Sequence, residues 1–294
     1  MTVIIFTYNR LLELQTTISA LKQNYLSDKV NLVIFSDGPK TEKDYKNVKK
    51  VREFIKEIKG FKSLEVIERK KNFGLARNII EGVTKVINVY NNVIVLEDDL
   101  VTSKNFLCYM KNALNFYEEK KEIFSISGYS MPLKSLKNYP YDTYLFYRPS
   151  SWGWATWKDR WNSIDWEIKD FNDFIKNKKL QKDFNKGGVD LTRMLKNYFE
   201  GKNNSWAIRW TYNMWKQGKY CVYPTKSKIQ NIGFGENATH CKGINIYKTL
   251  LDDINECDFN FLNKILVDEK IVKEFAYQYS YRNKLIKKIW EYLK

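Results

Sequence analysis

Strand and helix signals alternate over the first hundred residues. Four short runs that are apolar except for Glu65 lie at 3–6, 32–35, 64–67 and 93–96, and each predicts a strand. Apolar residues at helical spacing predict helices at 11–25, about 42–59, 75–90 and about 103–119, and a fifth strand is expected at 124–127. This order predicts a mainly parallel sheet with right-handed crossovers. Because the carboxyl ends of parallel strands share one edge, we expect a ligand site there.

The fourth apolar run ends in three adjacent carboxylates, Glu97, Asp98 and Asp99. Like charges this close together raise one another's pKa unless a cation compensates for them. The simplest compensating cation is a divalent metal, because Mg²⁺ and Mn²⁺ prefer oxygen ligands. The tip of this strand therefore predicts a metal site rather than an acidic surface turn.

Polar residues and a glycine also follow the other three apolar runs. At these positions the sequence has Thr7, Arg10, Asp37, Asn72, Gly74 and Arg77. A glycine lets the backbone approach a ligand closely, and a helix that begins near residue 75 points N–H groups at an anion. The sequence has neither a GxxxxGK[ST] loop nor a GxGxxG fingerprint, which argues against an ATPase and an NAD enzyme. Together with a metal at Asp99, these groups suit a nucleotide linked through a diphosphate.

The chain is strongly basic, with 50 Lys and Arg residues against 34 Asp and Glu residues and a formal charge of +16. Such a charge attracts nucleic acid, anionic lipid or small phosphate compounds, although a composition rich in Lys and Asn accounts for part of it. A nucleic-acid-binding protein would place aromatic residues among Lys and Arg on a sheet face. Here most Lys residues fall on predicted helices and the carboxylates would repel a phosphate backbone, so we expect no nucleic-acid partner.

The four cysteines show no CxxC spacing and lie at positions 108, 221, 241 and 257. We expect them to be reduced, unpaired thiols in a cytosolic protein. The first predicted strand begins at Thr2, which leaves no room for a signal peptide, and no run of about 18 apolar residues is present. These observations predict a cytoplasmic protein that is soluble or peripheral to a membrane.

Four short motifs carry a resemblance to a known family. They are TYNR at 7–10, SDG at 36–38, NFGL at 72–75 and EDDL at 97–100. In this order they resemble the GT-A-fold glycosyltransferases, most broadly the large bacterial family 2. The EDDL motif, followed by SWGW at 151–154 and a helix led by Trp206, is more specifically similar to the N-acetylglucosaminyltransferase I group. The resemblance covers about residues 2–240.

The resemblance implies an α/β fold of the GT-A type, with a mainly parallel central sheet flanked by helices. A fused aromatic-rich lobe on the acceptor side and a basic C-terminal helix would complete the chain. Residues 1–128 would be the half that binds the nucleotide sugar, and residues 129–245 would be the acceptor-binding half of the same domain. Residues 246–294 would form a helical extension.

The resemblance also implies roles for single residues. Asp99 would chelate Mn²⁺ or Mg²⁺, which bridges the diphosphate of a nucleotide sugar, most simply a UDP-sugar. Glu97 and Asp98 would contact the nucleoside or the sugar. Asp37 would contact the base, and Arg10 the phosphates. The chemistry agrees, because a divalent cation and an arginine stabilise the charge on a departing nucleoside diphosphate.

His240 is the only histidine in the sequence and closes a Gly-rich loop after the last predicted strand. Many GT-A enzymes supply a histidine ligand to the same metal at this place. The imidazole and the Asp99 carboxylate would give a mixed nitrogen and oxygen site suited to Mn²⁺. The alternative is a structural or solvated histidine.

The general base is missing from its expected place. Transfer with inversion, which we favour, needs a carboxylate to take the proton of the acceptor hydroxyl. In the family that carboxylate follows a Trp at the head of a helix, but the matching segment 206–210 contains no acid. Glu236 is the first substitute because it lies on the loop of His240, while Asp190 and Asp159 are weaker candidates.

Residues 139–166 carry much of the Trp and Tyr content of the chain. Most of these side chains should belong to the core, where aromatic rings bury a large area. Aromatic rings also stack on sugars, and Gly153 between Trp152 and Trp154 indicates a tightly shaped backbone. We expect one of these two tryptophans, together with Gly153, to line the sugar or acceptor pocket. Arg209 is a candidate anion clamp near the acceptor.

The C-terminal segment 281–294 has a basic amphipathic pattern. One helical arc would carry Leu285, Ile286, Ile289, Trp290 and Leu293, with four lysines on the opposite side. Such a helix is typical of an anchor at an anionic membrane surface. A helix that packs back on the domain is equally compatible with the pattern.

The sequence therefore predicts a metal-dependent hexosyl- or N-acetylhexosaminyl-transferase. It would move a sugar from a nucleotide donor to a glycan or lipid-linked glycan, as in the synthesis of bacterial surface polysaccharides or glycoconjugates. A lipid-linked acceptor would place it at the inner face of the cytoplasmic membrane. Two alternatives stay open: a basic nucleic-acid-binding protein, and a degenerate transferase retained as a binding partner. A nucleotidyltransferase would need a Gly-rich loop after the first strand, where this chain has TYNR.

Overall fold

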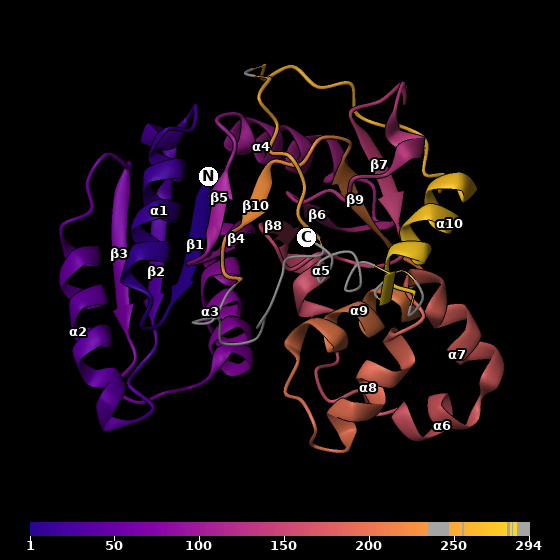
Figure 1. The fold of residues 1–294 in the computed structure, drawn as a ribbon, viewed down its shortest axis with the longest axis horizontal. Helices are drawn as coiled ribbons and strands as arrows, with labels where there is room; N and C mark the ends of the chain where they lie inside the picture. Colours follow the sequence, from indigo (N-terminus) through magenta and orange to yellow (C-terminus); the bar gives the residue numbers. More distant parts are fainter. Residues whose placement is uncertain (235–246, 255, 281–282, 284, 287–294) are drawn as a thin grey trace.

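The computed structural model of the chain (Figure 1) describes residues 1–234, 247–254, 256–280, 283 and 285–286. Two predicted site residues, Glu236 and His240, lie outside the described residues. The same holds for most of the segment 281–294.

The centre of the fold is a sheet of eight strands. Their order across the sheet is β3 (Ser63–Glu68), β2 (Asn31–Ser36), β1 (Thr2–Thr7), β4 (Asn92–Glu97), β8 (Trp154–Trp157), β6 (Ile123–Ser127), β9 (Tyr220–Pro224) and β7 (Thr143–Phe146). The first four strands are parallel, as predicted, and β6 is parallel to β9. Strand β8 is antiparallel to both of its neighbours, and β7 is antiparallel to β9. A separate antiparallel pair joins β5 (Leu100–Thr102) to β10 (Ile229–Asn231).

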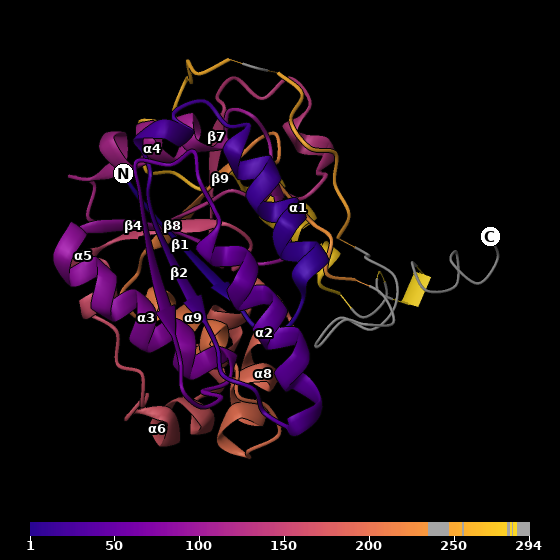
Figure 2. The same cartoon turned by 90° about the vertical axis from the view of Figure 1, so that its left-hand side faces the viewer.

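Helices cover the sheet on both sides. Their bounds are α1 (Leu11–Lys22), α2 (Glu42–Lys56), α3 (Leu75–Tyr90), α4 (Phe106–Tyr117), α5 (Lys158–Asn162), α6 (Phe171–Lys176), α7 (Lys178–Phe184), α8 (Leu191–Phe199), α9 (Trp206–Lys216) and α10 (Glu269–Gln278). Figure 2 shows α1 and α2 on one face of the parallel half and α3 on the other. Within the described ranges, no helix has the length and apolar character needed to cross a membrane.

The parallel half is held together by strands that are apolar on both faces. Every residue of β1 is buried, as are Val93–Leu96 of β4, which is typical of strands covered by helices on both sides. Gly82 lets α3 approach this sheet, because a Cβ atom there would lie 2.7 Å from the Phe6 ring and 3.2 Å from the Phe35 ring. The close packing of α3 fixes the position of the loop that precedes it.

The second half is built around tryptophans. The ring of Trp154 in β8 stacks on Trp161 with 5.6 Å between centroids and lies 4.5 Å from Trp210 and 5.4 Å from Trp206. Helices α6 to α9 add a smaller core of their own, formed by Ile168, Phe174, Phe184, Leu191, Leu195, Ile208 and Tyr212. The aromatic segment is therefore mostly core, as expected.

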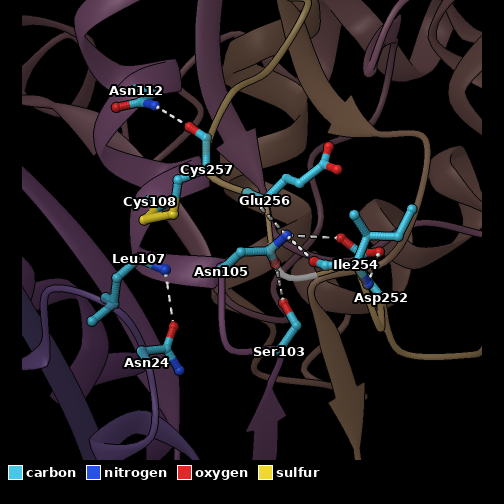
Figure 3. The surroundings of a disulfide bond; sticks show 10 residues. All are labelled: Asn24, Ser103, Asn105, Leu107, Cys108, Asn112, Asp252, Ile254, Glu256 and Cys257. Atoms are coloured by element: carbon cyan, nitrogen blue, oxygen red, sulfur yellow. Dashed lines mark hydrogen bonds between the residues drawn. A yellow bond between two sulfur atoms is a disulfide. The ribbon is translucent and has the colours of Figure 1, made fainter.

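The interpretation of the cysteines as unpaired thiols is wrong for Cys108 and Cys257, which form a disulfide (Figure 3). The disulfide joins α4 to the segment that follows β10. The separation of 149 residues hides this pair from an argument based on short spacings. Cys221 is a buried free thiol, whose pKa burial raises to about 12, and Cys241 lies outside the described residues. The disulfide also removes the argument from cysteines for a reducing compartment.

Hydrogen bonds reinforce the attachment of this segment. The side chain of Asn105 donates to the Asp252 carboxylate at 3.0 Å and to the carbonyls of Ile254 and Glu256 at 2.7 and 3.0 Å. Asn112 donates to the Cys257 carbonyl at 3.0 Å. Figure 3 shows that these contacts flank the disulfide. The segment that follows β10 is therefore attached to α4 by covalent and polar contacts together.

We expect Cys257→Ser to destabilise the protein, because a crosslink across 149 residues restricts the unfolded chain. The free energy of unfolding in urea should fall by about 2–4 kcal/mol. The matched control is Cys221→Ser, which leaves the disulfide in place. On a denaturing gel, reduction should change the mobility of this variant as much as it changes that of the wild type. Thiol titration of the unfolded, unreduced protein should detect two of the four cysteines, and detection of all four would contradict the pairing.

Candidate functional site

The parallel strands bring the predicted polar residues to one edge of the sheet. In the register of the sheet, Thr7 of β1 lies opposite Ser36 of β2, and Phe6 lies opposite Glu97 of β4. The residues that follow these strands, including Arg10 and Asp37, therefore meet at the carboxyl edge. The convergence expected from the sequence is confirmed.

Asp98 ties β4 to β1. Its carboxylate accepts hydrogen bonds from the Thr7 hydroxyl at 3.0 Å and the Tyr8 N–H at 3.3 Å, and it forms an ion pair with Arg10. Its carbonyl accepts from the Thr17 hydroxyl of α1 at 2.9 Å. Asp98 is 3% exposed, so these partners replace water around it. The structure thus gives Asp98 a positioning role that sequence reasoning did not identify.

Asp99 lies between Arg10 and the end of β10. Its Oδ2 atom is 3.0 Å from Nη2 of Arg10, and its carbonyl accepts from the Ile232 N–H at 2.9 Å. A Cβ atom at Gly233 would lie 1.9 Å from Oδ2, a distance that no side chain could occupy. Gly233 is therefore part of the site, although no sequence signal near Asp99 points to it.

The carboxylates carry more negative charge than Arg10 can neutralise. Loss of solvent and the neighbouring Asp99 and Asp98 charges raise the pKa of Glu97 to about 8. Burial raises the pKa of Asp98 to about 6, against the opposing effect of Arg10. A bound cation would relieve this excess charge.

The residues present fit a hard divalent cation. Carboxylate oxygens are the donors that Mg²⁺ and Mn²⁺ prefer, and Gly233 brings its backbone against the Asp99 carboxylate, where no other residue type would fit. In the part of the chain that the structure describes, no group of three or more His, Cys, Asp or Glu side chains forms a complete metal site. Asp99 would therefore share the metal with a ligand phosphate or with residues outside these ranges.

Asp37 organises the loop before α3. Its carboxylate accepts from the Phe73 N–H at 2.8 Å, the Gly74 N–H at 3.0 Å and the Gly38 N–H at 2.9 Å. The Asn72 side chain also links the loop before α3 to the turn after β2, because it donates to the Gly38 carbonyl at 2.8 Å. Gly74 has a φ of +71°, a conformation that glycine adopts without strain. Asp37, Asn72 and Gly74 are thus brought together as predicted, and Asp37 also fixes the loop.

Phe73 holds two arginines at this edge. The guanidinium carbons of Arg69 and Arg77 lie 4.5 and 4.3 Å from its ring centroid. Arg69 also donates to Asn78 at 3.2 Å, and Arg77 pairs with Glu81 at 2.6 Å. The aromatic ring therefore presents two cations beside the Asp37 loop, an arrangement suited to a nucleotide.

Gly153 lies beside the tip of β4. Its carbonyl accepts from the Gly128 N–H at 2.6 Å, its φ is +57°, and a Cβ atom there would lie 2.6 Å from the Ile229 side chain and 3.3 Å from that of Leu96. The adjacent Trp152 packs edge-on against Phe234, with centroids 5.8 Å apart. Trp152 and Gly153 therefore lie at the carboxyl edge of the sheet.

Other predicted residues take structural positions. Trp154 is 1% exposed within the tryptophan core, so we do not retain it as a pocket residue. Asp190 forms a buried ion pair with Arg148 at 2.8 Å, which is not the environment of a free base. Asp159 pairs with Arg160 at 2.7 Å and follows Trp157, which lies opposite Asn92 at the far end of β4. Neither carboxylate is available as the general base in this arrangement.

A parallel α/β half whose carboxyl edge gathers carboxylates, arginines and a glycine loop is typical of a nucleotide-sugar-binding GT-A domain. Comparison with family models agrees: the model of Glycosyl transferase family 2 matches residues 2–172. The chain belongs to this family. The predicted GT-A fold class is thereby confirmed.

Similar solved structures are distant in sequence. The mannosyltransferase PcManGT from Pyrobaculum calidifontis, in complex with GDP-Man and Mn²⁺, is 13% identical with a TM-score of 0.37, over 54% of this chain and 44% of that chain. S. aureus TarS 1–349 is 13% identical with a TM-score of 0.42, over 78% and 58%. GalNAc-T7 with UDP, GalNAc and Mn²⁺ is 12% identical with a TM-score of 0.48, over 83% and 45%. The chain thus covers 44% to 58% of the length of these structures. No curated protein matches the sequence.

Proposed function

We propose that the chain is a metal-dependent glycosyltransferase that moves a sugar from a nucleotide-sugar donor to a glycan or lipid-linked glycan. The observation that carries this proposal is the pair of buried carboxylates at the end of β4. Asp98 is held in place by Thr7 and Arg10, and the Asp99 carboxylate lies between Arg10 and the closely packed backbone of Gly233. Membership of Glycosyl transferase family 2 supports the same reaction class.

The donor would bind along the carboxyl edge of the parallel strands. Asp99 would hold the metal, and the metal would stabilise negative charge on the leaving nucleoside diphosphate. The Asp37 loop and the cations of Arg69 and Arg77 would contact the nucleotide. Arg10 keeps Asp98 and Asp99 in place and adds positive charge beside the phosphates. The motif order EDDL, SWGW and Trp206 supports a hexosyl or N-acetylhexosaminyl group carried by UDP.

Glu236 is our proposal for the base of an inverting transfer, and His240 for a second metal ligand. Gly233 lies against Asp99, and three residues of extended chain span at most about 10 Å. Glu236 is therefore within reach of the site by covalent geometry alone. Trp152 and Gly153 would contribute the nearby wall of the sugar pocket.

A lipid-linked acceptor would account for the basic character of the chain. The formal charge is +16, and Leu285, on the described part of the amphipathic segment, is 61% exposed. We propose that residues 281–294 rest on an anionic membrane surface at its cytoplasmic face.

A thermal-shift panel tests the proposed donor class. We expect one group among UDP-, GDP-, CMP- and dTDP-sugars to stabilise the protein only when Mn²⁺ is present. At 100 times its Kd, a ligand that binds the native state adds about 2.7 kcal/mol, a rise in Tm on the order of 5–10 °C. Release of nucleoside diphosphate in the same samples distinguishes an enzyme from a binding protein. A flat panel without turnover would favour the degenerate transferase instead.

A further inference from the structure

We propose that Arg209, at the first turn of α9, and the cavity beside it bind an anionic group on the acceptor, either a carboxylate or a phosphate. This inference rests on the proposed function, because it concerns the acceptor of a sugar transfer. It adds the charge of the acceptor, which neither the family nor the fold specifies.

Arg209 is a buried cation that lacks a carboxylate partner. Arg209 is 8% exposed. Among the residues that the structure describes, the hydrogen-bond acceptors of its guanidinium are the carbonyls of Ser205 at 3.4 Å and Trp166 at 3.3 Å. Arg160, which is 2% exposed, by contrast donates two hydrogen bonds of 2.7 and 2.9 Å to the Asp159 carboxylate. Burial without such a partner lowers the pKa of Arg209. A buried cation is costly unless it is paired, so an anion would stabilise this position.

The start of α9 adds positive potential to that of Arg209. The N-terminus of a helix carries a partial positive charge, which acidic residues in the first turn commonly offset. The first turn of α9 contains no acidic residue, and Ser205 caps it through a neutral hydroxyl that accepts from the Ile208 N–H at 3.2 Å. Two independent sources of positive potential therefore coincide at one place.

A wide-open surface cavity of about 610 Å³ lies near this position. It is lined by Glu167, Tyr198, Phe199, Gly201, Asn203 and Asn204. Arg209 is not itself one of these lining residues, but its guanidinium lies 4.7 Å from the ring of Tyr198, which is one of them. Aromatic rings and side-chain amides suit a sugar ring and its hydroxyls. The Glu167 side chain is 79% exposed and lies 3.8 Å from Lys169, so it does not neutralise Arg209.

The location of α9 points to the acceptor rather than the donor. Trp206, the first residue of α9, contacts Trp154, which pairs with Val95 near the end of β4. The donor edge is formed by β1 to β4 and their loops, on the other side of that contact. A ligand held at Arg209 would therefore approach the tip of β4 from the second half of the chain.

Two saccharides that differ in one charge test this proposal. Methyl glucuronide carries a carboxylate where methyl glucoside carries a hydroxymethyl group, so their dissociation constants can be compared by calorimetry at low salt. We expect the wild type to bind the glucuronide on the order of tenfold more tightly. Arg209→Gln should abolish the preference, whereas Arg209→Lys should keep part of it. The matched control, Lys196→Gln on α8, removes an exposed cation and should keep the wild-type ratio.

Competition with inorganic phosphate separates the two sources of the anion. Displacement of the glucuronide by phosphate in the wild type would indicate a general oxyanion site, and no displacement would assign it to carboxylates. Equal binding of both saccharides by the wild type overturns the proposal whether or not the variants fold. A preference that persists in Arg209→Gln overturns it as well. The stabilisation of the protein by nucleotide sugar and Mn²⁺ is measured separately and tests the proposed function. Failure of the anion site at Arg209 can therefore be distinguished from failure of the proposed function.

Discussion

Asp99→Asn should abolish Mn²⁺-dependent release of nucleoside diphosphate while leaving the fold intact. The substitution removes the charge that would hold the metal, and loss of metal stabilisation of a leaving diphosphate lowers turnover on the order of 10²–10³-fold or more. It also removes one of the two neighbouring negative charges that add to the effect of burial in raising the pKa of Glu97 to about 8. We therefore expect Tm to stay constant or rise. Opposite effects on activity and stability are the signature of a functional carboxylate.

The matched control for this experiment is Asp159→Asn. Asp159 is 55% exposed and lies beyond the opposite end of β4, so its substitution should leave the turnover of the folded protein unchanged. Because it removes the carboxylate partner of the buried Arg160, we expect its Tm to fall, in contrast to that of Asp99→Asn. Turnover and its Mn²⁺ dependence are measured on both variants from the released nucleotide. Full activity of Asp99→Asn would show that the metal is held elsewhere.

Gly233→Ala should impair donor binding although it adds only one methyl group. The new Cβ atom would lie 1.9 Å from Oδ2 of Asp99 and 3.0 Å from Nη1 of Arg10, so the carboxylate must move. Because metal ligands tolerate little displacement, we expect the Mn²⁺-dependent thermal shift to fall by at least half and turnover to fall at least tenfold.

Gly218→Ala provides the control for the general effect of losing a glycine. Its Cβ atom meets nothing within 4 Å, and its φ of +64° makes the substitution cost on the order of 1 kcal/mol through the backbone alone. This variant should lose some Tm but keep the thermal shift that Mn²⁺ and the donor produce. Equal donor binding by both variants would remove Gly233 from the site.

Local sequence patterns were sufficient to predict the strands and helices of the first half of the fold. Strands β1 to β4 and the helices between them were predicted because each is a continuous apolar or periodic run, and their parallel order follows from the alternation. Strand β8 was not predicted, because Trp154–Trp157 is only four residues long and pairs with strands distant in sequence. The disulfide was missed for the same reason. Pairings over long separations leave no local pattern.

The same distinction between local patterns and long-range pairings applies to the candidate site. The meeting of Arg10, Asp37 and the carboxylates was predictable from the common direction of the strands that precede them. The contact of Gly233 with Asp99 was not, because β10 follows β4 by more than a hundred residues. The roles of Trp154 and Asp190 depended on burial, which tryptophan packing and the Arg148 ion pair decide in three dimensions.

The hydrogen bonds of Asp98 have a consequence for mutational screens. Thr7, Tyr8 and Arg10 all lie on or just after β1, so replacing Asp98 would loosen the junction of two central strands as well as the site. In a screen that scores growth or activity, Asp98 and Asp99 would look equally intolerant. A parallel readout of protein abundance should separate them, with depleted protein for Asp98 variants and normal levels of inactive protein for Asp99 variants.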